Sequence, residues 1–133
     1  MTGEGKRGAG PAASSRRAEA EARGRAAEDG AAAALERNGW RLLARRVRTG
    51  AGELDLVAEK EGLLAFVEVK ARPSLADAAR ALAPRQQARL LAAAEAWLAV
   101  NPGHGEAGMR FDVILVDPAG RVRRLADAFR EGD

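Results

Sequence analysis

The segment from residue 52 to residue 72, GELDLVAEKEGLLAFVEVKAR, has two apolar arms on either side of a charged centre. Both arms are rich in aliphatic and β-branched residues, which favour strands. The centre, residues 60–62, reads Lys-Glu-Gly, and a glycine at such a place is typical of a tight turn. Two antiparallel strands joined by a short turn satisfy this pattern, so the sequence predicts a β-hairpin.

Three charged residues interrupt the apolar arms of this hairpin, namely Asp55, Glu68 and Lys70. Residues two apart on a strand project to the same face, so Glu68 and Lys70 lie together, and antiparallel pairing brings Asp55 beside them. Charges among apolar neighbours are costly unless they are compensated. Carboxylates bind hard cations such as Mg²⁺, so the pattern predicts a metal site with Asp55 and Glu68 as ligands.

The chemistry that this set predicts is metal-assisted hydrolysis of a phosphodiester. Lys70 then orients the attacking water or stabilises the negative charge that develops on the phosphate. The competing interpretation is a salt-bridge cluster on a solvated face of the sheet. A lone Glu-x-Lys pair favours that interpretation, whereas the complete set, with Glu53 beside it, favours a functional site.

The same residues carry a resemblance to known families. The segment GELDLVAEKEGLLAFVEVKAR is similar to the signature of the YraN-like family of uncharacterised bacterial proteins, and the resemblance extends over about residues 24–117. Asp55 followed by Glu68-x-Lys70 also resembles the metal site of the PD-(D/E)xK nucleases. This resemblance implies a restriction-endonuclease-like αβββαβ core, an α/β (α+β) mixed sheet flanked by helices.

The resemblance further implies a Mg²⁺- or Mn²⁺-dependent endonuclease that hydrolyses DNA phosphodiesters, with branched DNA as an expected substrate by analogy to Holliday-junction resolvases. Some members of the superfamily bind nucleic acid without cutting it. A non-catalytic nucleic-acid-binding module is therefore one alternative, and a protein-interaction adaptor with a purely structural charge cluster is another.

A helix is expected over residues 18–38, because alanine is the strongest helix former and apolar residues recur there at helical spacing. Gly39 fits the position just after the helix end. Trp40, the next residue, is then placed for the hydrophobic contact that accompanies such a cap. The resemblance implies that Glu28 in this helix is an auxiliary metal ligand or supporting group, as is Glu53. An ion pair between Glu28 and Arg25 on the helix surface is an equal alternative.

The other elements follow from local patterns. An irregular strand is expected over residues 40–49, because Leu42 and Leu43 break the alternation. Asp112 lies inside an apolar strand, where it either supports the site or pairs with Arg110 or Arg121, and pairing is favoured. The remaining expectations are a loop or short helix over 75–83, a helix over 84–100, a strand over 109–117, a short strand over 121–125 and a final helical turn.

Arginine is abundant around the expected site and pairs bidentately with phosphate. An arginine-rich composition of GC-rich genomes, or a solvated edge strand, explains the same residues without a nucleic-acid partner. The net charge is positive but only +3. A basic balance supports DNA binding, but a charge of this size does not establish it. The candidate nucleic-acid-binding residues are Arg45, Arg46, Arg48, Arg72, Arg85 and Gln86.

The length of 133 residues fits one domain, expected over residues 18–133, after a disordered basic arm over residues 1–17. The absence of cysteine excludes disulfides, thiolate zinc sites and cysteine nucleophiles, and the absence of tyrosine excludes tyrosine catalysis. No apolar run is long enough to span a bilayer, so we expect a cytoplasmic protein without a membrane partner. A homodimer is expected, since two-fold dimers bring a site to each DNA strand.

Overall fold

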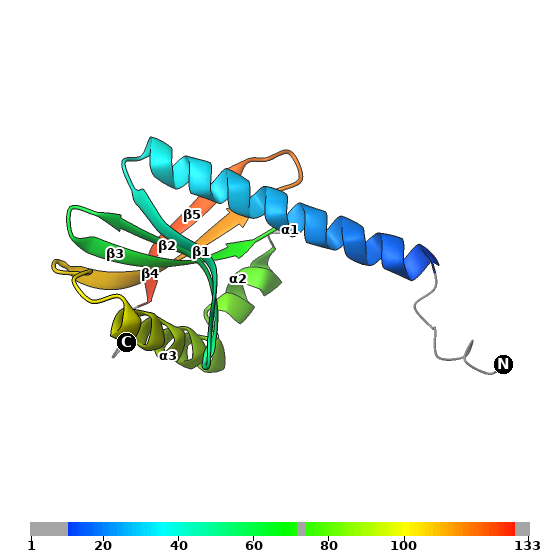
Figure 1. Cartoon of the computed structure of the whole chain (residues 1–133). Coiled ribbons are helices and arrows are strands. Elements are labelled where there is room, and N and C mark those ends of the chain that lie inside the picture. The colour runs from blue at the N-terminus through cyan, green and yellow to red at the C-terminus, as the bar shows by residue number, and fades with distance from the viewer. Residues whose placement is uncertain (1–10, 72–73, 130–133) are drawn as a thin grey trace.

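The computed structural model describes residues 11–71 and 74–129. Five strands form one mixed sheet in chain order, in which β3 and β4 are parallel and the other neighbours antiparallel. Helix α1 covers one face, and α2 and α3 lie on the other (Figure 1). The expected mixed sheet flanked by helices is thereby confirmed. The elements are α1 (Pro11–Arg37), β1 (Arg41–Thr49), β2 (Gly52–Lys60), β3 (Leu63–Lys70), α2 (Leu75–Ala81), α3 (Pro84–Val100), β4 (Gly108–Val116) and β5 (Val122–Phe129).

Helix α1 begins at Pro11, earlier than the expected start at residue 18. Proline is favoured in the first turn of a helix, and the alanines and arginines that follow are good helix formers. Residues 11–17 of the expected disordered arm are therefore helical, whereas residues 1–10 lie outside the described part of the chain. The buried side chains of α1 begin at Ala27, and its first half extends beyond the sheet (Figure 1).

The end of α1 agrees with the sequence. Gly39 has a φ of 89° and its N–H donates to the Glu36 carbonyl, while Trp40 N–H donates to the Leu35 carbonyl. These two bonds form the Schellman arrangement that a glycine after the last turn permits. Trp40 and Leu35 are both buried in the core beneath α1, so the cap also fixes the direction in which β1 begins.

Two hydrophobic layers separate the sheet from its helices. Alternation assigns residues to the layers along β3 and over residues 56–58 of β2, whereas Leu54 lies in the opposite layer from Leu56. The α1 layer contains Ala27, Ala31, Ala32, Leu35, Trp40, Leu56, Ala58, Ala65, Val67, Ile114 and Val116. The α3 layer contains Leu54, Val57, Leu64, Phe66, Leu90, Ala93, Ala94, Trp97, Phe111 and Phe129. In the described residues no helix combines the length and apolarity needed to cross a membrane.

The C-terminal strand differs from the expectation. Strand β5 continues to Phe129, past the predicted strand end at residue 125, whereas residues 130–133, where a helical turn was predicted, lie outside the described part of the chain. The ring of Phe129 stacks on that of Phe111 with centroids 4.6 Å apart, and this contact holds the end of the chain against the sheet. This contact between two paired strands outweighs the weak local preference of the segment.

The hairpin formed by β1 and β2 bends away from the rest of the sheet toward α3 (Figure 1). Strand β1 is irregular as predicted, with a register shift between Leu42 and Ala44. Strand β2 pairs with β3 from Lys60 to Leu56, and the pairing stops there. At the far end of the hairpin, a Cβ on Gly52 would lie 3.1 Å from Cγ of Arg89 in α3. The hairpin tip thus packs directly against α3.

Replacing Gly52 by alanine is expected to lower the free energy of unfolding by about 1 to 3 kcal/mol. The φ of Gly52 is +155°, and the added methyl group would press on the Arg89 side chain. Urea unfolding measures the effect. The matched control is Gly50→Ala in the same turn, because a Cβ at Gly50 meets nothing within 4 Å. Equal losses in both variants would contradict this packing of the hairpin on α3.

Candidate metal and phosphodiester site

Asp55 lies at the point where β2 leaves β3. The pairing of these strands ends at Leu56 and Val67, one residue short of Asp55. The Val69 N–H, which faces β2, donates instead to Oδ2 of Asp55 at 2.8 Å. A backbone donor that has no strand partner is thereby satisfied by a carboxylate, and that bond holds the Asp55 side chain in the opening between the strands.

Glu68 and Lys70 lie on β3 beside this opening. Glu68 follows Val67, as Asp55 precedes Leu56, so the two carboxylates face each other across the end of the antiparallel pairing. Lys70 Nζ lies 3.1 Å from Glu68 Oε2, and the two side chains are 32% and 11% exposed. The structure therefore brings together the three residues that the sequence singled out.

The electrostatics of this cluster are unfavourable for a bare carboxylate. Burial raises the pKa of Asp55 to about 7, and the negative charges of Glu68 and Glu28 add to the rise, while the bond from Val69 N–H opposes it. The folded protein thus disfavours the charged form of Asp55 up to about neutral pH. A cation bound there would remove this penalty.

The donor set fits a hard divalent cation. Carboxylate oxygens suit Mg²⁺ and Mn²⁺, and Mg²⁺ is usually held by one or two carboxylates while water and substrate oxygens complete its coordination. Among residues 11–71 and 74–129, no three His, Asp or Glu side chains are grouped so that they could hold a metal ion together. A metal at this place would have two protein ligands, the carboxylates of Asp55 and Glu68, and water or substrate oxygens would complete its coordination.

Glu28 approaches the site from α1. Its side chain is 13% exposed, and its Oε1 accepts a hydrogen bond of 2.7 Å from Arg46 Nε. The predicted alternative, an ion pair with Arg25, is replaced by this contact with β1. Arg46 has a φ of 51°, a left-handed conformation that costs energy for a residue other than glycine and that is enriched at functional sites.

Glu53 lies farther out on the hairpin, where its carboxylate is 3.6 Å from Arg48 Nε. Glu53 and Glu28 line one surface depression together with Arg46 and Arg48. Glu28 lines this depression and its charge also raises the pKa of Asp55, whereas Glu53 is not among the main groups that shift the pKa of Asp55.

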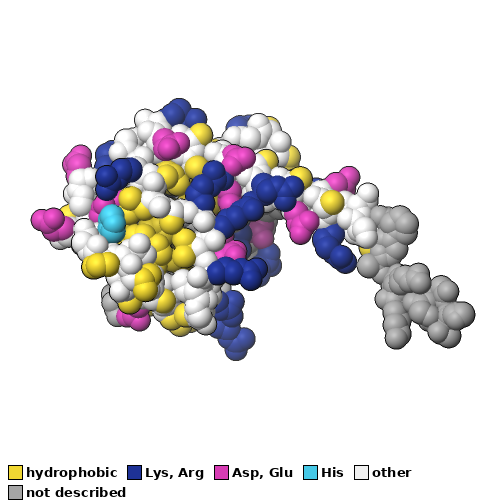
Figure 2. Space-filling model, in the orientation of Figure 1, with side chains coloured by type: hydrophobic (Ala, Val, Ile, Leu, Met, Phe, Trp, Pro, Cys, Tyr) yellow, Lys and Arg dark blue, Asp and Glu magenta, His cyan; other side chains and the backbone are white. Residues whose placement is uncertain are grey.

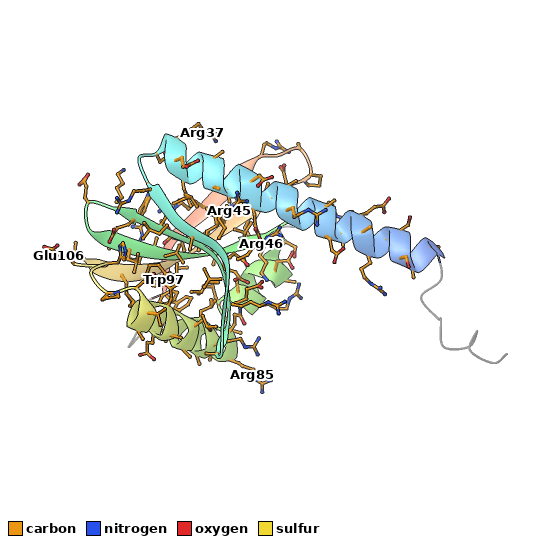
Figure 3. All side chains as sticks on the ribbon, viewed as in Figure 1. Arg37, Arg45, Arg46, Arg85, Trp97 and Glu106 are labelled. Atoms are coloured by element: carbon orange, nitrogen blue, oxygen red, sulfur yellow. The ribbon has the colours of Figure 1, made fainter. Side chains whose placement is uncertain are left out.

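The candidate nucleic-acid-binding residues fall into two groups. Arg45 and Arg46 lie beneath α1, and Arg85 lies at the start of α3 (Figure 3). Arg45 donates to Asp29 Oδ1 at 2.6 Å, so each of the three hairpin arginines has a carboxylate partner. Gln86 and Arg85 instead line a depression next to Lys70. Arg72 lies outside the described residues.

Two arginines that the sequence analysis did not select, Arg80 and Arg89, line the depression beside Lys70. Arg89 follows Arg85 by four residues, and this spacing places both on one side of a helix. The four-residue spacing from Arg85 was the sequence signal that could have identified Arg89 as a further candidate residue for nucleic-acid binding. Figure 2 shows Lys and Arg side chains in a band from the middle of α1 past the β1–β2 hairpin toward α3.

Asp112 belongs to a different cluster. It is 1% exposed and accepts hydrogen bonds from Arg124 Nη2 at 2.6 Å and Asp127 N–H at 2.7 Å. Arg110 Nε lies 3.2 Å from its carboxylate. The expected pairing with Arg110 is present, but Arg124 takes the place of Arg121, which pairs with Asp117. Asp112 therefore has local partners that account for its burial.

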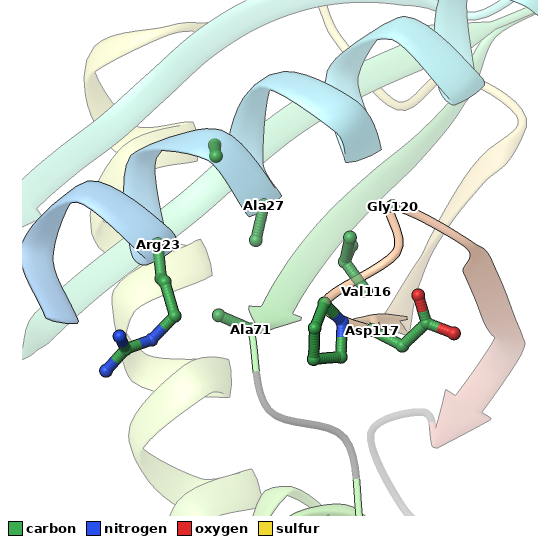
Figure 4. Close-up of a pocket in the computed structure, with 8 residues that line it drawn as sticks. Arg23, Ala27, Ala71, Val116, Asp117 and Gly120 are labelled. Carbon is green, nitrogen blue, oxygen red and sulfur yellow. The ribbon is translucent and has the colours of Figure 1, made fainter. Parts of the chain in front are cut away.

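A third hollow lies between α1 and the turn after β4 (Figure 4). Its volume is about 130 Å³, and Ala27, Ala71 and Val116 make its floor largely apolar. Arg23 and Asp117 lie at its rim. None of the three candidate catalytic residues lines it.

Comparison with known proteins places these residues in a family context. The model of the uncharacterised protein family UPF0102 matches residues 27–116, a range that contains Glu28, Asp55, Glu68 and Lys70. A UPF0102 protein of Granulibacter bethesdensis is 58% identical over 113 residues, which cover 80% of this chain and 72% of the relative. UPF0102 proteins of Rhodopseudomonas palustris and a Bradyrhizobium species are 55% and 57% identical over 106 residues, with 82% and 75% of the relatives covered.

Proposed function

This chain belongs to the uncharacterised protein family UPF0102, and from the site that it forms we propose that the protein is a Mg²⁺- or Mn²⁺-dependent endonuclease acting on DNA phosphodiesters. The YraN-like family resemblance found in the sequence is confirmed by the family match. The relationship to the PD-(D/E)xK nucleases stays a prediction, and the proposed activity rests on the site itself.

The observation that carries the proposal is the pair of facing carboxylates in the opening between β2 and β3. Asp55 is fixed there by Val69 N–H, and Glu68 is held against Lys70. A purely structural ion-pair cluster is expected to balance its charges, yet burial raises the pKa of Asp55 to about 7, and repulsion from Glu68 and Glu28 adds to the rise. A partly buried pair of carboxylates whose ionisation the protein disfavours in this way is typical of a site that binds a cation.

In this proposal Asp55 and Glu68 hold the metal, and each residue around them has a separate task. A bound divalent metal supplies an acidic water and stabilises negative charge on a phosphate. Lys70 keeps its ammonium group beside Glu68, where it orients the attacking water or stabilises the developing charge. Arg46 holds the Glu28 carboxylate toward the site, where it adds negative charge for the metal.

Cleavage of labelled DNA tests the proposal directly. Single-stranded, duplex, flap and four-way-junction DNA are incubated with the wild type, Asp55→Ala and Lys70→Ala in Mg²⁺ or Mn²⁺, after circular dichroism has confirmed folding. We expect each variant to cut at least about 100-fold more slowly than the wild type. The control is Glu95→Ala, an exposed position on α3, which should cut normally.

Cutting at the wild-type rate by folded Asp55→Ala protein would contradict the proposal. A non-catalytic nucleic-acid-binding module is the second candidate, and the Glu68–Lys70 ion pair favours it, because a structural charge cluster would contain the same contact. Salt-dependent DNA binding by a wild type that cuts none of the four substrates in either metal would establish that candidate.

A further inference from the structure

We propose that the depression between the end of β3 and helices α2 and α3 binds a backbone phosphate of nucleic acid, and that Arg85 and Arg89 supply most of the protein's affinity for nucleic acid. The identity of the ligand rests on the proposed nuclease function. The binding itself requires neither metal nor cleavage, so the two proposals can fail separately.

The lining of the depression has the chemistry of an anion site. Its volume is about 580 Å³, and four cationic side chains line it without any carboxylate. Lys70 is shared with the carboxylate site, so the depression opens directly beside Asp55 and Glu68. A phosphate in the depression would therefore neighbour the phosphate at the carboxylates, which is the arrangement of consecutive groups along a nucleic-acid backbone. The lining residues are Lys70, Arg80, Ala81, Ala83, Arg85, Gln86 and Arg89.

The four cations of the depression differ in whether a carboxylate already neutralises them. Arg80 pairs with Asp77, and Lys70 pairs with Glu68. Within the described part of the chain Arg85 and Arg89 form no ion pair, and Arg89 Nη1 donates only to the neutral Gln86 Oε1 at 3.4 Å.

Both free guanidinium groups are exposed and lie one helical turn apart on α3. Like charges at this spacing repel each other, and a bound anion would turn that repulsion into two attractive contacts. The two arginines are thus available to a phosphate without first breaking an ion pair.

The opposite flank of the carboxylate site has a different charge balance. The guanidinium groups of the hairpin arginines Arg45, Arg46 and Arg48 each lie between 2.6 and 3.6 Å from a carboxylate. A phosphate there must compete with that carboxylate and is repelled by the glutamates that line the same depression. The sequence does not distinguish the two groups of arginines, whereas the ion pairs assign the larger share of affinity to α3.

Binding measured without metal tests this assignment. Fluorescence anisotropy of a labelled DNA duplex is recorded in EDTA over a series of NaCl concentrations for the wild type and the double variant Arg85→Gln/Arg89→Gln. Glutamine keeps the side-chain stem that packs against Gly52. We expect affinity to fall at least about tenfold and the slope of log K against log salt to decrease in magnitude by about 0.9, the value for one lost phosphate contact.

The matched control is Arg45→Gln/Arg48→Gln, which removes the same charge from the hairpin flank and should weaken binding less than about threefold. Equal losses in the two double variants, or wild-type binding by Arg85→Gln/Arg89→Gln, would overturn the proposal. Displacement of the duplex by inorganic phosphate at a concentration equal to that of the duplex would also overturn the proposal, because that result indicates a site for a small free anion.

The cleavage assay keeps this proposal distinct from the nuclease proposal. Normal DNA binding by Arg85→Gln/Arg89→Gln, together with loss of cleavage in Asp55→Ala, would overturn the phosphate site alone. Weakened binding by the arginine variant, together with undiminished cleavage by Asp55→Ala, would support the phosphate site and overturn the catalytic assignment.

Discussion

An Asp55→Asn protein is expected to be more stable than the wild type at about pH 8 without divalent metal, by on the order of 2 to 4 kcal/mol. The same variant should lose both cleavage and the stabilisation that Mg²⁺ gives to the wild type. The gain arises because asparagine can still accept the Val69 N–H bond but carries no charge beside Glu68 and Glu28.

The direction of the pH effect follows from the raised pKa of Asp55. The carboxyl group titrates near 3.8 in the unfolded chain and at about 7 in the folded protein, so between these values the folded protein binds more protons. Its contribution to stability is complete below about pH 4, falls as the pH rises through this window, and is lost above about pH 7. Asparagine does not titrate, so the stability of the variant does not decrease in this way as the pH rises.

Urea unfolding in EDTA at about pH 5 and about pH 8 measures the effect, and repetition with Mg²⁺ tests the metal site. Mg²⁺ should stabilise the wild type more at the higher pH, because Asp55 must lose its proton to bind the ion. Acidic groups remote from Asp55 contribute equally in both proteins, so the difference between the proteins reports on Asp55 together with the carboxylates beside it. Parallel pH profiles, or equal stabilisation of both proteins by Mg²⁺, would contradict the assignment.

Replacing Asp112 by alanine is expected to lower the free energy of unfolding by about 3 to 5 kcal/mol. The change leaves Arg110 and Arg124 without their shared carboxylate and removes the acceptor of Asp127 N–H. Both guanidinium groups lie 5.0 Å from the centre of the Trp40 ring, and this contact alone does not replace an ion pair. A loss of that size is a large part of the stability of a domain of this length.

The matched control for Asp112 is Asp29→Ala, which removes an acidic residue from an exposed ion pair with Arg45. Such pairs contribute about 0 to 1 kcal/mol, so this variant should unfold nearly as the wild type does. Urea unfolding of both proteins at neutral pH gives the comparison. A change below about 1 kcal/mol in Asp112→Ala would show that the buried cluster is not needed for stability.

The core of the candidate site could be predicted because it depends on local geometry. Glu68 and Lys70 are two residues apart on one strand, and the tight turn after Lys60 sets the register that brings Asp55 opposite Glu68. The partner of Glu28 could not be predicted in this way. Arg25 is its neighbour along the helix, but the crossing of α1 over β1 brings Arg46 to it instead.

The sequence by itself determined the hairpin, the cap at Gly39, helix α3 and the face on which Asp55, Glu68 and Lys70 meet. Each of these depends on spacing within a short stretch of chain, where side-chain direction repeats with the period of a strand or helix. The tertiary structure alone decided that β2 leaves β3 at Asp55, that Asp112 pairs with Arg124, and which arginines stay free. Ion-pair partners depend on how elements distant in sequence pack against each other. The sequence therefore does not show whether a given arginine has a carboxylate beside it in the folded protein.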